Sequence, residues 1–334
     1  MSSGRYAALT GWGMAVPQRI VTNAELAQKV DTSDEWIRTR TGIRERRVAG
    51  PDEPTSALAA AAGQAALVRA GLSAADIDMV IVTTCTPDRP FPATACAVQA
   101  RLGMAHGSAF DLVAACSGFV YGMTVASGLV RSGVSRNLLL IGADIFTHLI
   151  NWNDRNTCVL FGDGAGAVVL QATDAPLGLL SANLGSWGEG EDLMVAETGG
   201  TRQPATPELL ASGSQFVTMN GREIFKHAVR EMCNSAQRAV EEAGLTLDDI
   251  ALVVPHQANV RIIEAVARRL ELPMDRFVVN LDRYGNTSAA SVPIALSEAA
   301  EQGRIPDGAY VLMTAFGGGL TWGSCVVRWG GSPK

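Results

Sequence analysis

The chain has 334 residues, enough for two domains or for one large α/β unit with a sizeable core. With 47% hydrophobic and 18% charged residues it has the composition of a soluble globular enzyme, and its net charge of −6 argues against a general nucleic-acid binder. No apolar run is long enough to span a bilayer, and Met1–Tyr6 lacks the apolar segment of a signal peptide. We therefore expect a cytoplasmic protein with no membrane partner.

A sequence pattern near the first predicted helix is repeated half a chain later. The helix over Ala57–Ala70 ends in a Gly-Leu turn that leads into a buried apolar strand, in the segment Ala70–Ile81. A second helix over Glu223–Ala243 leads into a similar segment, Ala243–Val254. The two copies are 173 residues apart (243 − 70). The repeat predicts a chain built from two related halves.

Cys116 lies where an apolar strand ends and another helix begins. Free cysteine usually packs as a small hydrophobic residue. A thiol at a helix start is also suited to catalysis, because the partial positive charge of the helix N-terminus, or a nearby imidazole, lowers its pKa. The six cysteines of the chain include no C-x-x-C pair and no histidine at ligand spacing, which argues against a zinc site and a disulfide framework. We expect a reducing environment and no metal.

The glycine cluster Gly162–Gly166 resembles a nucleotide-binding loop only superficially. It lacks the G-x-G-x-x-G spacing of a dinucleotide fold and the lysine of a P-loop. We interpret it as a tight turn before a strand over Ala167–Leu170, and we expect no NAD, ATP or other cofactor.

The segment Asn183–Asn220 interrupts the duplicated plan. It is rich in Gly, Pro, Thr and Glu with little periodicity, and it therefore predicts loops at the start of the second half. Such loops either cover a nearby site or only connect elements on the surface. We place the two halves at residues 1–175 and 176–334.

Two polar side chains of the second half are candidates to act with the thiol. His256 and Asn286 follow apolar or glycine-containing segments. Asn286 and Cys116 each precede a helix and are 170 residues apart (286 − 116), as are Gly133 and Gly303, where those helices are expected to end. We infer that Cys116 and Asn286 correspond in two β-α-β-α-β-β units whose sheets share central helices, with the site between them. A thiol, a histidine and an asparagine together suggest an acyl-thioester enzyme.

Seven motifs, in order from about Ala8 to Trp329, carry a family resemblance. The chain resembles β-ketoacyl-acyl-carrier-protein synthase III, a family of thiolase-fold condensing enzymes that start bacterial fatty-acid synthesis. The resemblance implies an α/β, thiolase-like, five-layered αβαβα fold and a homodimer. The motifs are Asp31–Ile37, Thr39–Arg46, Ala114–Gly118, Phe161–Gly166, Val254–Asn259, Gly285–Pro293 and Phe316–Ser324.

The resemblance also implies catalytic roles. Cys116 would be the nucleophile that takes an acyl group from acyl-CoA. His256 and Asn286 would bind the thioester carbonyl of malonyl-acyl-carrier protein and stabilise the enolate that forms when CO2 leaves, as two neutral hydrogen-bond donors. The N–H groups of Gly318 and Cys116 would form the oxyanion hole of acyl transfer.

Binding residues follow from the same resemblance. Trp36 and Arg155 would sandwich the CoA adenine and Arg40 would lie beside the CoA phosphates, with Asn259 and Phe225 as further substrate contacts. Phe146 would lie near the acyl pocket, and Phe91 of the partner subunit would close it. A set of basic side chains would dock the acidic carrier protein, unless they only form a solvated helix face: Lys226, Arg261, Arg268 and Arg269.

The implied reaction condenses a short acyl-CoA, acetyl-CoA in particular, with malonyl-acyl-carrier protein and yields 3-ketoacyl-acyl-carrier protein, CO2 and CoA. One alternative is a starter-unit ketosynthase or acyltransferase of a polyketide or other secondary-metabolite pathway, which shares these motifs. A more distant one is a non-catalytic thiolase-fold protein that binds acyl carriers; such a protein would lack the nucleophile or the donors.

Overall fold

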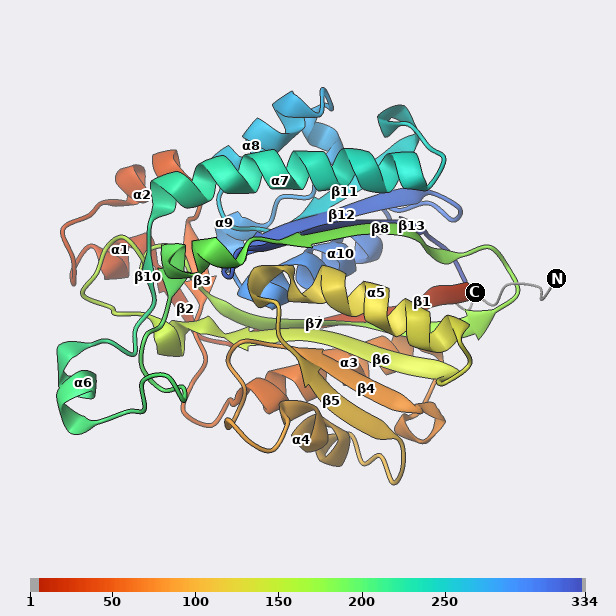
Figure 1. Cartoon of the computed structure of the whole chain (residues 1–334), viewed down its shortest axis with the longest axis horizontal. Helices are drawn as coiled ribbons and strands as arrows, with labels where there is room; N and C mark the ends of the chain where they lie inside the picture. The colour runs from red at the N-terminus through yellow and green to blue at the C-terminus, as the bar shows by residue number, and fades with distance from the viewer. Residues whose placement is uncertain (1–5, 332–334) are drawn as a thin grey trace.

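The computed structural model describes residues 6–331, so Met1–Arg5 of the N-terminal segment discussed above lie outside the described residues. The elements form five layers in which helices and sheet alternate (Figure 1). This is the α/β arrangement that the repeat and the resemblance predict. No helix in residues 6–331 is both long enough and apolar enough to cross a membrane.

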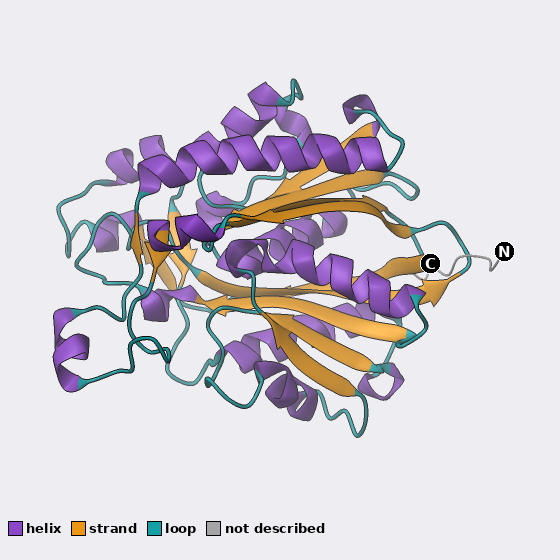
Figure 2. Ribbon diagram, viewed as in Figure 1, coloured by secondary structure: helices purple, strands orange, loops and turns teal. Residues whose placement is uncertain are grey.

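Nine strands form two layers of mixed sheet (Figure 2). A single residue pair, Ala7 with Gly178, joins the two layers. The first layer contains, in spatial order, β5 (Ser108–Leu112), β4 (Met79–Thr83), β6 (Asn137–Ile145), β7 (Asp163–Thr173) and β1 (Tyr6–Ala15). The second continues with β8 (Gly178–Ser186), β13 (Thr321–Arg328), β12 (Tyr310–Gly317) and β11 (Ile250–Pro255). Each layer contains parallel strands: β4 pairs in parallel with β6 in the first layer, and β11 pairs in parallel with β12 in the second.

Helices lie between and outside the two sheet layers. The central pair is α5 (Gly118–Arg131) and α10 (Ser291–Glu301); the outer pairs are α3 (Thr55–Ala70) with α4 (Thr94–Arg101), and α7 (Gly221–Glu242) with α8 (Val260–Arg269). Phe119 and Met123 of α5 and Leu296 of α10 are fully buried in one core with strands from both layers. These two helices are mainly apolar because they are covered from both sides.

Short elements surround the layers at one end. They are β2 (Ile20–Thr22), α1 (Asn23–Leu26), α2 (Asp34–Thr41), β3 (Glu45–Arg47), β9 (Met194–Val195), α6 (Pro207–Ser212), β10 (Thr218–Met219) and α9 (Leu281–Tyr284). The segment expected to consist of loops, Asn183–Asn220, begins within β8 and then contains β9, α6 and β10 with loops between them.

The repeated sequence pattern forms the same local structure twice. α3 and α7 are followed by Gly71 and Gly244, with φ of 66° and 71°, in the left-handed region that favours glycine. Each turn then leads through a short capped helical turn, at Ser73 and at Thr246, into β4 or β11. We propose that the two halves meet near residue 175, in the connection between β7 and β8.

The central helices start at positions 173 residues apart, which corrects one expectation. The 3₁₀ turns that precede them, Ala115–Ser117 and Ser288–Ala290, begin with residues of φ 45° and 51°. Cys116 therefore corresponds to Ala289, and the expected correspondence with Asn286 was wrong. The reason is helix length: α5 has 14 residues and α10 has 11, so the offset falls to 170 only at the helix ends.

All of the glycine cluster except Gly162 lies within a strand, so its interpretation as a turn was also wrong. β7 begins at Asp163, and its glycines face the central helix α10. A Cβ atom on Gly166 would lie 2.6 Å from the backbone of both Pro293 and Ile294. The missing side chain lets α10 approach the sheet closely.

This close approach predicts a large difference between two glycine-to-alanine variants. Gly166→Ala should lower the free energy of unfolding by about 1–3 kcal/mol, because backbone cannot move aside as a side chain can. Gly128→Ala, on an exposed site of α5 with no atom near the added Cβ, should raise it by about 0.5–1 kcal/mol. Urea unfolding of both variants measures this, and equal effects would contradict the packing described.

Candidate active site

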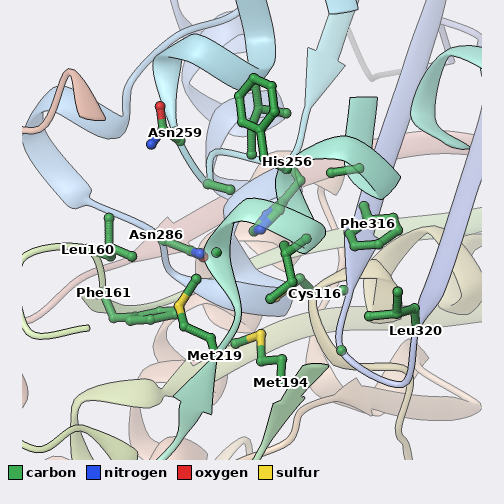
Figure 3. Close-up of a pocket in the computed structure, with 18 of the residues that line it drawn as sticks. Cys116, Leu160, Phe161, Met194, Met219, His256, Asn259, Asn286, Phe316 and Leu320 are labelled. Atoms are coloured by element: carbon green, nitrogen blue, oxygen red, sulfur yellow. The ribbon is translucent and has the colours of Figure 1, made fainter. Parts of the chain in front are cut away.

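A cavity of about 300 Å³ opens beside Cys116 and contains all three side chains predicted to act together (Figure 3). Cys116 comes from the turn before α5, His256 follows β11, and Asn286 precedes the turn before α10. The wall is mostly apolar and includes Leu160, Phe161, Met194, Met219, Ile224, Phe225, Ala228, Met232, Ile262, Phe316 and Leu320. A cavity of this kind accepts a mainly apolar ligand and places polar groups at one end.

Backbone hydrogen bonds hold the two side chains of the second half in place. The His256 N–H donates to the Thr314 carbonyl oxygen at 2.8 Å, which extends the pairing of β11 with β12. The Asn286 N–H donates to the Leu160 oxygen at 2.8 Å, and the Gly162 N–H donates to the Asn286 oxygen at 3.0 Å. Asn286 is thus fixed against the segment that precedes β7.

The Cys116 thiol is buried, with 3% of the residue exposed. Its Sγ lies 3.5 Å from Ser288 Oγ. Burial raises the pKa of the thiol to about 12, and the hydrogen bond from Ser288 offsets only part of this effect. The expected lowering of the pKa by the helix start or an imidazole was therefore wrong for the protein without substrate, because desolvation outweighs it. At neutral pH the thiol is protonated.

His256 and Asn286 are also buried and both are neutral. Burial lowers the pKa of His256 to about 3. Its Nδ1 lies 2.6 Å from Ser291 Oγ. The Asn286 Oδ1 accepts the Ser288 N–H at 2.9 Å, and its amide nitrogen lies on the side of His256 and Cys116 (Figure 3). The side chain can therefore donate a hydrogen bond into the cavity.

The far wall of the cavity contains Phe161, which the sequence analysis did not single out. Phe146, expected near an acyl pocket, does not line this cavity but stacks behind Phe161, with ring centroids 4.3 Å apart. Met194 and Met219, from β9 and β10, form another wall. Of the two interpretations of Asn183–Asn220, the structure supports a cover over the site. The only sequence signal for these two methionines was that they lie in the segment Asn183–Asn220, at the start of the second half.

Two of the predicted CoA contacts line the cavity and the other three lie near it. Asn259, the N-cap of α8, and Phe225, 38% exposed on α7, both line the cavity. Trp36, Arg40 and Arg155 lie together nearby, since α2 packs against α8 and the neighbouring Asn156 lines the cavity.

The guanidinium groups of Arg40 and Arg155 both contact the Trp36 ring, at 4.4 and 5.4 Å from its centroid. Arg155 also donates to the Asp31 carbonyl oxygen at 2.8 Å and pairs with the Asp31 carboxylate at 3.1 Å. A base stacked between Trp36 and Arg155 needs a gap of about 7 Å, at about 3.5 Å per contact. Arg155 would therefore have to move from its present position to admit one.

The other predicted residues lie on the surface. Lys226, on α7, and Arg261, Arg268 and Arg269, on α8, are all exposed on two helices that pack against each other. Phe91 is 85% exposed and does not line the cavity. Within residues 6–331, no three His, Cys, Asp or Glu side chains come together as a metal site requires.

Comparisons with known proteins assign this chain to a family. The model described as 3-oxoacyl-[acyl-carrier-protein (ACP)] synthase III matches residues 110–188, and the model of its C-terminal part matches residues 240–329. A relative named beta-ketoacyl-[acyl-carrier-protein] synthase III, from Roseiflexus sp. (strain RS-1), is 71% identical over 324 residues, covering 97% of this chain and 98% of its own. This chain belongs to the β-ketoacyl-[acyl-carrier-protein] synthase III family.

Solved structures confirm the thiolase-like fold. The enzyme from Aquifex aeolicus VF5 is 44% identical and superposes with a TM-score of 0.90, covering 97% of this chain and all of its own. The priming β-ketosynthase of the R1128 polyketide biosynthetic pathway has a TM-score of 0.92 but is 36% identical, covering 99% of this chain and 98% of its own. The family resemblance noted in the sequence is therefore confirmed.

Burial of neutral His256 predicts a specific pH dependence of stability. The folded pKa, about 3, lies below the ordinary value of 6.5, so the unfolded chain binds more protons between these values. The contribution is complete above pH 6.5 and is lost as the pH falls toward 3. Asp163 has the opposite effect on stability, since burial raises its pKa to about 6. A variant that changes only His256 keeps this effect of Asp163, so it cancels in a comparison with the wild type.

His256→Gln removes this titration and keeps a polar side chain. From pH 6.5 to 4.5 the wild type should lose about 1–3 kcal/mol more unfolding free energy than the variant. Urea unfolding at a series of pH values measures both curves. Parallel curves would mean that His256 is not held neutral by burial.

Proposed function

We propose that this synthase condenses a short acyl-CoA, acetyl-CoA in particular, with malonyl-acyl-carrier protein to give 3-ketoacyl-acyl-carrier protein, CO2 and CoA, and so initiates type II fatty-acid synthesis. The observation that carries the proposal is a buried thiol and two neutral donors at the end of one apolar cavity. The high identity to proteins named synthase III favours this role over a polyketide starter-unit enzyme. A non-catalytic carrier-binding protein is disfavoured because the thiol and both donors are present.

In the first half-reaction Cys116 Sγ attacks the carbonyl carbon of the acyl-CoA thioester. The bond from that carbon to the CoA sulfur breaks, and the thiol proton passes to the departing sulfur, so that no net charge is left in the buried site. The N–H groups of Cys116 and Gly318 stabilise the intermediate oxyanion. Gly318 lines the cavity, and its neighbour Gly317 approaches the Cys116 backbone so closely that a Cβ would lie 2.6 Å from the Cys116 nitrogen.

In the second half-reaction the bond between the malonyl methylene carbon and its carboxylate breaks. CO2 leaves, and the electron pair is delocalised onto the thioester oxygen as an enolate. His256 and Asn286 donate hydrogen bonds to that oxygen, and their low-dielectric surroundings strengthen both interactions. The enolate carbon then attacks the acyl carbonyl on Cys116 and the bond to Sγ breaks. The Cys116 thiolate takes up one proton from solvent, which is the proton that the overall decarboxylating condensation consumes.

The substrates, the assembly and the location belong to the same proposal. Trp36 and Arg155 bind the CoA adenine once Arg155 leaves Asp31, and Arg40 contacts the phosphates. A homodimer brings Phe91 of one chain to the acyl pocket of the other, which fits its 85% exposure in the single chain. All six cysteines are free, which fits a cytoplasmic enzyme. The proposed reaction uses no bound cofactor. Acyl-CoA is a substrate in it, and CoA leaves as a product.

Asn286→Ala separates the two half-reactions. The variant should still take one acyl group from acyl-CoA, whereas release of CO2 from malonyl-acyl-carrier protein should fall by ~100- to 1,000-fold, as for loss of an oxyanion donor. Mass spectrometry measures the first step, and release of labelled CO2 measures the second. An equal loss of both would indicate that Asn286 supports the fold rather than the enolate.

Docking of the carrier protein is proposed at the basic face of α7 and α8. Reversing one charge there, in Arg261→Glu, should raise KM for malonyl-acyl-carrier protein and leave acylation by acyl-CoA nearly unchanged. The wild-type KM should rise with salt, because rim charges act on association and are screened over ~8 Å at physiological ionic strength. Arg131→Glu, at the exposed end of α5, is the matched control. A KM indifferent to Arg261→Glu and to salt would place docking elsewhere.

A further inference from the structure

Among the hydrogen bonds of the Cys116, His256 and Asn286 side chains, the shortest is made with a serine that has not yet been given a role. Ser291 Oγ lies 2.6 Å from His256 Nδ1. Ser291 is the first residue of α10 and is 1% exposed, and His256 is 4% exposed. The contact therefore joins the start of a central helix to the end of β11, out of reach of bulk water.

The neighbouring groups determine the direction of this hydrogen bond. Ser291 Oγ also receives the Gln257 N–H, at 3.4 Å. Among the described residues no other hydrogen bond of this hydroxyl is found, so its own hydrogen has one acceptor, Nδ1 of His256. In the opposite arrangement Nδ1–H and Gln257 N–H would both donate to Oγ, and a buried hydroxyl hydrogen would have no acceptor, which is costly.

We propose that Ser291 is a positioning residue that holds His256 as the neutral tautomer with its hydrogen on Nε2. The inference rests on the proposed function, because it specifies which atom of His256 faces the enolate. With Nδ1 accepting from Ser291, Nε2–H is the free donor of the ring. The other tautomer would present a lone pair to the developing negative charge on the thioester oxygen and would repel it.

This tautomer also assigns the proton of the first half-reaction. Nε2 already carries a hydrogen, so His256 cannot accept the Cys116 proton there. The proton therefore goes directly to the departing CoA sulfur. His256 is thus a donor in the second half-reaction and takes no proton in the first.

The peptide that carries the second contact of Ser291 is itself held firmly. The Gln257 side chain donates from Nε2 to the carbonyl oxygens of Pro255 and Val278, each at 2.9 Å, and its Oε1 accepts the Asn280 N–H at 3.0 Å. Gln257 is 1% exposed. Because this residue is fixed on three sides, its N–H stays directed at Ser291 Oγ and keeps the hydroxyl hydrogen turned toward His256.

The tautomer is measurable by ¹⁵N NMR of protein labelled in histidine, without reference to activity. The chain has only four histidines, and the His256 signals are those lost in His256→Gln. The wild type should show a protonated Nε2 and an unprotonated, hydrogen-bonded Nδ1 at neutral pH. Ser291→Ala should give a mixture of tautomers, and Ser291→Thr, which keeps the hydroxyl, should restore the wild-type pattern.

Kinetics of the same variants test the consequence. In Ser291→Ala, release of CO2 from malonyl-acyl-carrier protein should fall by ~10- to 100-fold in kcat, the size of loss seen when the partner that orients a metal-binding histidine is removed. KM and acylation of Cys116 should change little. Ser297→Ala is the matched control, because it removes another buried hydroxyl of α10, one that donates to the Gly13 carbonyl oxygen and not to His256.

The two measurements distinguish failure of this inference from failure of the proposed function. A wild-type His256 protonated on Nδ1, or a Ser291→Ala variant with an unchanged tautomer and unchanged CO2 release, overturns the role of Ser291. If Ser291→Ala does not fold, the wild-type spectrum alone decides the tautomer. A wild-type enzyme that releases no CO2 from malonyl-acyl-carrier protein would instead refute the proposed function.

Discussion

Desolvation of the site between the two sheet layers determines its chemistry. The central helices α5 and α10 and the neighbouring Met194 and Met219 bury the end of the cavity, where Cys116, His256 and Asn286 are 3%, 4% and 6% exposed. Burial holds the Cys116 thiol protonated, with a pKa raised to about 12, and His256 neutral, with a pKa lowered to about 3. The site therefore carries no charge before substrates bind, and in the proposed mechanism the enolate that forms there is stabilised by hydrogen bonds in a low dielectric.

Two turns with left-handed residues give this site its geometry. Ala115 and Ser288 precede the central helices and place the Cys116 Sγ and Ser288 Oγ 3.5 Å apart. The buried carboxylate of Asp144, on β6, accepts the Ala289 N–H at 3.0 Å and the Cys85 N–H at 2.9 Å, and so ties the second turn to the first half. Strained backbone of this kind persists where its surroundings hold it firmly. The two corresponding turns thus bring the Cys116 thiol, the proposed nucleophile, and the Ser288 hydroxyl together.

Local patterns in the sequence predicted the fold well. The Gly-Leu turns after α3 and α7 have one structural solution, and the motifs around Cys116, His256 and Asn286 identify the residues that meet in the cavity. What the sequence could not reveal depends on three-dimensional packing. The raised pKa of Cys116, the place of Phe161 in front of Phe146, and the bond from Ser291 to His256 all arise from contacts between distant segments. Ser291 lies within the motif Gly285–Pro293, but the motif alone does not indicate that its hydroxyl bonds to His256.

The central claim is that the buried Cys116 carries the acyl group, and peptide mass spectrometry after incubation with acetyl-CoA tests it most directly. Cys85 is the strongest competitor, because its Sγ also lies 3.5 Å from Ser288 Oγ. Burial raises the pKa of Cys85 well above its ordinary value, and Cys85 does not line the cavity. We expect one acetyl group per chain, on the Cys116 peptide, and none in Cys116→Ala. Acetyl on Cys85, or undiminished labelling of Cys116→Ala, would contradict the account.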